Sequence, residues 1–192
     1  MSKMINGVDV ERLVGTIEAI KVDAKVASFQ FRLTNKWAGG GENRSKIEGF
    51  HGANQEMRHA TAFEVVNDES PVLLGNDHAP NPVEHVLSAL AGCLTTSLAY
   101  HAAARGIAVK GVSTRLEGDL DLHGFLGLSE KTRRGFQSIR VVFDIDGDLT
   151  AAQKTELIEL AQRYSPVFDI VSNGVPVEAR VAGFGEKNRS AA

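Results

Sequence analysis

The sequence predicts a single α+β domain organised around one long helix. Three features indicate this class: an uncharged apolar segment near the middle of the chain, alternating strand-like runs before it, and further alternating runs with a second helix after it. Because strands come in groups and do not alternate one by one with helices, the pattern favours α+β over α/β. With 192 residues and 43% hydrophobic content, the chain is long enough for one good core.

The long helix is predicted to begin at Pro82 and to end at Gly106. Asn81 can cap the first free amides, Pro82 suits the first helical position, and Glu84 stands where a capping-box carboxylate reaches back. No charge occurs between Glu84 and Arg105. We therefore expect a helix of roughly 36 Å that is buried on most sides.

The residues before this helix predict one helix and three strands. An apolar stripe predicts a helix over residues 5–25, although it weakens near its end. Alternation then starts at Ala27, and two more strands are expected at residues 45–50 and 57–66. With a glycine-rich turn at residues 39–43, the three strands form an antiparallel meander.

The residues after the long helix predict further strands and helices. A loop over residues 67–80 leads into the long helix. The expected elements that follow it are a strand at 107–118 that can extend to 122, a charged loop at 124–135, a strand at 136–146, a helix at 150–164, a short helix at 166–171 and a last strand at 175–182. A frayed tail is expected over residues 183–192.

Composition excludes several classes of partner. A formal net charge of −3 and a pI near 6.1 provide no basic surface, so we expect no nucleic-acid partner. The first nine residues are too polar for a signal peptide, and no apolar run is expected to span a membrane. The single cysteine cannot form an internal disulfide, which favours the cytoplasm.

Two interpretations of the long helix remain open. In the first, a partner chain covers it, because small residues crowd its surface and allow a second backbone to approach. These residues are Ser88, Ala89, Ala91, Gly92, Ser97, Ala99 and Ala102 to Ala104. In the second interpretation, the sheets of one chain wrap the helix completely in a monomer.

Cys93 is the main candidate for chemistry. A free cysteine is often an inert buried residue, and reactivity requires a lowered thiol pKa from a nearby cation, imidazolium or helix N-terminus. Cys93 lies about three turns into its own helix, so the dipole of that helix contributes little. His85 and His101 are each eight residues away, which is about 12 Å along a helix and too far for contact.

No other pattern indicates a cofactor or a metal. The six histidines lack metal-ligand spacing, and no paired cysteines or carboxylate cluster occur, so we expect neither a metal nor a cofactor. Five arginines could each place a guanidinium near the thiol: Arg58, Arg115, Arg133, Arg134 and Arg140. Glu84 is interpreted as a capping residue first.

The segment from Asn81-Pro82 to Ala-Leu-Ala-Gly-Cys93-Leu resembles the OsmC/Ohr family of thiol-dependent peroxidases. The resemblance continues into Tyr164-Ser165-Pro166-Val167 and covers roughly residues 55–182. It implies an OsmC-like fold in which two small antiparallel sheets surround a central helix, in an intertwined homodimer with active sites at the interface. It also implies reduction of organic hydroperoxides, with Cys93 as the residue that attacks the peroxide.

Three of the four functional positions implied by the resemblance are changed. Ser165 stands at the place of the second, resolving cysteine, so no internal disulfide can form. Val83 follows the Asn-Pro where the family commonly has a glutamate, and residues 69–80 contain no activating arginine. A reactive Cys93 would then need a one-cysteine cycle with an external thiol, or another activating group, for which Arg58 or His59 is the candidate.

The resemblance divides the chain into an N-terminal extension with the first strands (1–50), an OsmC-like domain (51–182) and the tail (183–192). Two functions follow. The first is a homodimeric protein of oxidative-stress defence that acts on a small-molecule hydroperoxide through Cys93, with Ser165 as its polar neighbour. The alternative is an inactive OsmC-like dimer that binds a small apolar ligand.

Overall fold

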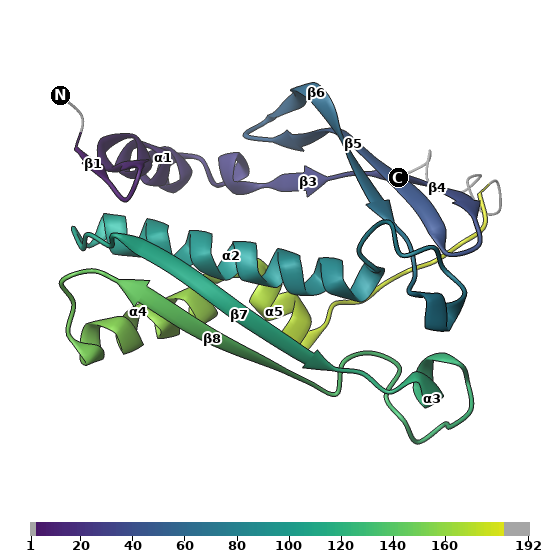
Figure 1. The fold of residues 1–192 in the computed structure, drawn as a ribbon. Helices are drawn as coiled ribbons and strands as arrows, with labels where there is room; N and C mark the ends of the chain where they lie inside the picture. Colours follow the sequence, from purple (N-terminus) through teal and green to yellow (C-terminus); the bar gives the residue numbers. More distant parts are fainter. Residues whose placement is uncertain (1–2, 183–192) are drawn as a thin grey trace.

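The computed structural model describes residues 3–182 and confirms the α+β class. Helix α2 (Pro82–Ala104) lies at the centre of the molecule, as Figure 1 shows, with a β-hairpin and two further helices packed along it and a separate β-meander above it. The sheets are small and antiparallel. The predicted arrangement of small sheets around a long central helix is therefore correct.

Helix α2 has the predicted ends. The Asn81 side chain accepts a hydrogen bond from the Glu84 amide, and the Glu84 carboxylate accepts one from the Asn81 amide, which completes the capping box. Arg105 caps the other end, and Gly106 follows with a φ of +72°. By length and composition, α2 could cross a membrane, contrary to our expectation for the sequence. Leu90, Leu94 and Leu98 lie in the core instead, as in a core helix.

The core lies between α2, the hairpin and the C-terminal helices. Strands β7 (Gly111–Asp119) and β8 (Ser138–Asp146) pair in antiparallel register and alternate between inward and exposed residues, as predicted. Helices α4 (Ala151–Tyr164) and α5 (Pro166–Asn173) also pack against α2. The core residues are Leu90, Leu94, Leu98, Ala102, Ile145, Leu157, Leu160 and Ala161.

The predicted meander is present, but its first strand is broken. Strands β3 (Phe29–Phe31) and β4 (Thr34–Gly39) both pair with β5 (Glu42–Gly52), which pairs on its other side with β6 (Gln55–Asn67). The turn is shorter than predicted, because Gly39 already pairs with Glu42. Gly40 adopts a φ of +53°, which glycine tolerates without steric cost.

The N-terminal prediction is wrong at its start. A hairpin of β1 (Met4–Ile5) and β2 (Val8–Asp9) precedes α1 (Val10–Val22), which is followed by the short helix η1 (Ala24–Ala27). The hairpin turns at Asn6, whose φ is +53°. Its side chain donates to the Ile107 carbonyl at 2.9 Å and accepts from the Val109 amide at 2.9 Å. Contacts with the segment that follows α2 therefore override the local helical pattern.

Two predictions after α2 also differ from the structure. Strand β7 ends at Asp119, because Asp121 caps the short helix α3 (Leu122–Phe125) by accepting a hydrogen bond from the His123 amide. The strand predicted at 175–182 is absent: these residues follow Gly174 as an exposed segment that pairs with no strand among residues 3–182. The predicted tail at 183–192 lies outside the described residues. The loop before α2 contains a short helix, η2 (Pro71–Leu73).

Candidate functional site

Cys93 lies in the middle of α2 as a free, half-buried thiol. It follows Leu90 by three positions and Val86 by seven, so helical geometry places the three side chains on one side of the helix. The next residue, Leu94, is only 1% exposed and belongs to the core. Cys93 therefore lies at the border between the core and the surface of α2.

A groove of about 500 Å³ opens on this side of α2. Val86 and Leu90 line it from α2, Ile139 lines it from β8, and Phe168 lines it from α5. Arg133 is the only charged residue among the described residues that line this groove. Its volume falls within the range of small-molecule sites, which are mostly apolar with a few polar groups. The groove is therefore the candidate substrate site, and Cys93 lies about one helical turn beyond Leu90 without lining the groove itself.

Ser165 joins helices α4 and α5. It is 2% exposed, and its hydroxyl accepts a hydrogen bond from the Phe168 amide at 3.2 Å, which caps the N-terminus of α5. Its own amide donates to the Ala161 carbonyl at 3.0 Å. Since Phe168 lines the groove, Ser165 holds one wall of the candidate site in place.

The structure separates the five candidate arginines. Three form ion pairs: Arg115 with Glu117, Arg134 with Glu130, and Arg140 with Asp119. The hydrogen bond from Arg140, followed by that from Ser138, holds the pKa of the Asp119 carboxyl well below its usual range. Of the five, only Arg133 lines the groove.

The strand residues named as alternative activators lie in the meander. Arg58 is on β6 opposite Gly49, where it lines a hollow of the meander surface and not the groove at α2. His59 packs between Phe50 and Phe63 with its ring tilted against both, at ring-centroid separations of 5.8 and 4.8 Å. Neither residue belongs to the groove beside Cys93 within this chain.

Histidines and carboxylates do not form a metal site in the described part of the chain. Residues 3–182 contain no group of three or more histidine, cysteine, aspartate or glutamate side chains that could hold a metal ion. His101 stacks on Tyr164 with centroids 4.5 Å apart, and burial lowers the pKa of its imidazole. It has a packing role at the far end of α2.

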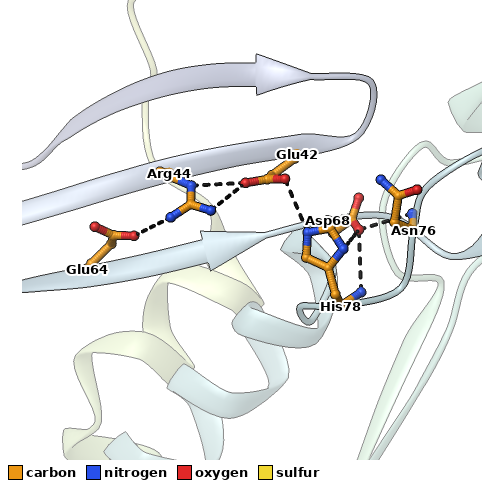
Figure 2. Close-up of polar contacts among 6 residues, drawn as sticks. All are labelled: Glu42, Arg44, Glu64, Asp68, Asn76 and His78. Carbon is orange, nitrogen blue, oxygen red and sulfur yellow. Dashed lines mark hydrogen bonds and ion pairs between the residues drawn. The ribbon is translucent and has the colours of Figure 1, made fainter.

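One polar network, shown in Figure 2, was not predicted from the sequence. Arg44 on β5 bonds to Glu64 on β6 at 2.9 Å and to Glu42 at 2.8 Å. His78 lies between two carboxylates, with Nε2 3.1 Å from Glu42 and Nδ1 3.3 Å from Asp68. The network joins the meander to the loop that leads into α2.

Asp68 is the buried end of this network. Its side chain is 0% exposed, its Oδ2 accepts from the Asn76 amide at 3.1 Å, and its Oδ1 has no hydrogen-bond partner. Hydrogen bonds from the backbone, first from Glu69 and then from His78 and Asn76, hold the pKa of the Asp68 carboxyl below its usual value. The hydrogen bond from Arg44, followed by that from His78, lowers the pKa of Glu42 in the same way.

The comparisons with known proteins agree with this architecture. The family described as OsmC-like protein matches residues 75–180, and the chain belongs to this family of α+β proteins. No curated protein matches the sequence.

Solved structures share the fold at low sequence identity. An OsmC-like protein from Mycoplasma pneumoniae superposes with a TM-score of 0.59 at 14% identity, covering 75% of this chain and 88% of that chain. The organic hydroperoxide resistance protein OsmC from Legionella pneumophila superposes with a TM-score of 0.52 at 17% identity, covering 77% of this chain and 94% of that chain. An organic hydroperoxide resistance protein from Elizabethkingia anophelis superposes with a TM-score of 0.52 at 18% identity, covering 77% of this chain and 92% of that chain.

The substitution Asp68→Asn tests the network. Asp68 has a lowered pKa in the folded state, so its contribution to stability is present above the unfolded pKa of about 3.9 and is lost as the pH falls through the folded value. We expect Asp68→Asn to lower the Tm by about 3 °C or more at pH 7. The difference in Tm between the Asp68→Asn variant and the wild type should become smaller below roughly pH 4.

Thermal unfolding followed by circular dichroism between pH 3 and 7 measures both effects. Asp77→Asn is the matched control, because Asp77 is an exposed residue of the same loop at a φ of +57°, which asparagine tolerates. An equal decrease in Tm in the two variants would contradict the proposed role of Asp68. So would a Tm difference between Asp68→Asn and the wild type that does not change with pH.

Proposed function

We propose that this protein acts in the response to oxidative stress by reducing organic hydroperoxides with the Cys93 thiol. The observation that supports this most directly is the half-buried free thiol on the side of α2 that borders an apolar groove. Two of the fold neighbours are described as organic hydroperoxide resistance proteins. The groove provides apolar walls for the organic part of such a substrate.

The chemistry follows from the thiolate. Cys93 Sγ attacks the terminal peroxide oxygen, a sulfur–oxygen bond forms, the oxygen–oxygen bond breaks, and the leaving alkoxide takes a proton to become the alcohol. Cys93 is thereby oxidised to a sulfenic acid. An external thiol then attacks the sulfenic sulfur, releases water and leaves a mixed disulfide, which a second thiol reduces. We propose this one-cysteine cycle because Ser165 cannot provide the second sulfur.

The rate of Cys93 oxidation by cumene hydroperoxide, followed by mass spectrometry across pH, tests this function. A thiol adapted for the reaction should oxidise much faster than a free cysteine. Cys93→Ser should abolish the oxidation. Oxidation no faster than that of free cysteine would remove the enzymatic function and direct attention to ligands of the groove.

The substitution Ser165→Cys introduces a second thiol and tests whether positions 93 and 165 are close enough to form a disulfide. If the Cα atoms lie within about 7 Å, hydroperoxide should convert Cys93 and the introduced thiol into a disulfide. The measurement is the loss of both free thiols under non-reducing conditions, with Ser113→Cys on the exposed side of β7 as the control.

The outcome depends on correct folding, because Ser165 caps α5 and its loss costs about 0.5–2 kcal/mol of stability. Circular dichroism of the variant checks this point. If a folded Ser165→Cys variant forms a stable sulfenic acid at Cys93 and no disulfide, positions 93 and 165 are too far apart for a disulfide.

We propose that the protein is a cytoplasmic homodimer built on the exposed face of α2. Ala89, Gly92, Thr96 and Tyr100 are exposed at helical spacing, and a Cβ placed on Gly92 would meet no atom within 4 Å. A second backbone can approach closely along such a face. An apolar helix with one open side therefore favours a partner chain over a monomer.

The substitution Gly92→Arg should convert the dimer into a monomer, because it places a long charged side chain in the middle of the proposed contact. Sedimentation velocity measures the mass, and Ala152→Arg on the exposed start of α4 is the helical control. A monomeric wild type, or a dimer that survives Gly92→Arg, would exclude this interface.

A further inference from the structure

The segment that joins β7 to β8 carries an exposed apolar tip. It contains the short helix α3 and lies beyond the end of the hairpin (Figure 1). Three large apolar side chains follow one another closely at this tip: Phe125 is 59% exposed, Leu126 is 53% exposed and Leu128 is 70% exposed. Exposed apolar side chains that lie together in this way mark surfaces that bind a protein or a membrane.

Contacts within the segment hold the tip in one shape. The Leu128 amide donates a hydrogen bond to the His123 carbonyl at 2.9 Å, which closes the turn after α3. Gly124 is buried, and a Cβ at this position would lie 2.5 Å from the Arg133 carbonyl oxygen, so the two halves of the segment touch. The apolar side chains are therefore presented by a folded turn, and binding does not first have to order the backbone.

Positive charge follows the tip directly. Residues 121–134 contain three cations and two carboxylates, in a chain whose formal net charge is −3. Glu130 pairs with Arg134 at 3.1 Å, and the other carboxylate caps α3. Lys131 and Arg133 are exposed and form no ion pair among residues 3–182. These two cations are therefore available to an anionic surface.

The combination of an apolar tip and adjacent cations selects the partner. A contact between the tips of two copies would bring Lys131 and Arg133 of one copy close to the same cations of the other, and like charges oppose such a contact. A bilayer with anionic lipids satisfies both features. Its acyl chains accept the apolar side chains, and its headgroups attract the cations.

We propose that the tip binds the surface of bilayers that contain anionic lipids. Phe125, Leu126 and Leu128 enter the boundary between the headgroups and the acyl chains, while Lys131 and Arg133 contact the headgroups. The protein then associates reversibly with a membrane surface, and no segment crosses the membrane. This binding does not involve Cys93, so it is independent of the proposed reduction of hydroperoxides.

Co-sedimentation with lipid vesicles tests the proposal. We expect the protein to bind vesicles of equal parts phosphatidylglycerol and phosphatidylcholine at least about tenfold more tightly than vesicles of phosphatidylcholine alone. Most of this difference should disappear at about 1 M salt, because the screening length is then about 3 Å.

The double substitution Lys131→Gln and Arg133→Gln tests the cations. We expect it to weaken binding to the anionic vesicles about 25-fold, because each cation near such a surface contributes about fivefold. Lys25→Gln combined with Lys36→Gln is the matched control, since it removes the same charge from exposed positions outside the segment. This control should bind like the wild type.

The double substitution Phe125→Ser and Leu128→Ser tests the apolar tip. We expect it to weaken binding about tenfold to hundredfold, because two exposed side chains no longer transfer into the bilayer. Val72→Ser removes an exposed apolar side chain elsewhere and should bind like the wild type. Circular dichroism of all variants establishes that a loss of binding is not a loss of folding.

Three results would overturn the proposal. The first is a wild type that does not bind the anionic vesicles or binds both kinds of vesicle equally. The second is equal binding by the wild type and by the folded double variant of Phe125 and Leu128. The third is a mass in sedimentation velocity that falls in this variant while the wild type binds no vesicles, which would assign the tip to a contact between copies of the chain.

Discussion

Burial of one side of α2 is the constraint on which the rest of the structure depends. Leu94 and Leu98 are 1% and 0% exposed, and each leucine buried in this way contributes about 1.5–3 kcal/mol. The hairpin β7–β8 and helix α4 supply the atoms that surround them. Because this packing fixes the rotation of α2 about its axis, it also fixes which residues face the groove and which face outward.

The rotation of α2 gives its surfaces different uses. The leucine side stabilises the domain, Val86 and Leu90 line the groove, and the side with Gly92 is open. Two separate sets of interactions hold the start of the helix in place. The Asn81 and Glu84 capping box satisfies its free amides, and the network around Asp68 and His78 anchors the preceding loop to the meander.

The sequence predicted features that neighbouring residues determine. The capping boxes, the alternation of β7 and β8, and the ends of α2 all depend on residues within a few positions of each other. The turn at Asn6 and the exposed segment at 175–182 depend on contacts, or missing contacts, with distant parts of the chain. For the same reason, no pattern distinguished Arg133 from Arg134, since only the packed groove separates them.

Ser165 connects the stability of the site with its chemistry. A hydroxyl oxygen is a strong N-cap acceptor, whereas a thiol sulfur is a weak one. At a position that is 2% exposed and must cap α5, serine stabilises the wall that carries Phe168 better than a cysteine would. The same choice removes the internal route for resolving an oxidised Cys93. In the one-cysteine cycle proposed above, a protein with this arrangement has a firmer groove and needs an external thiol to reduce an oxidised Cys93.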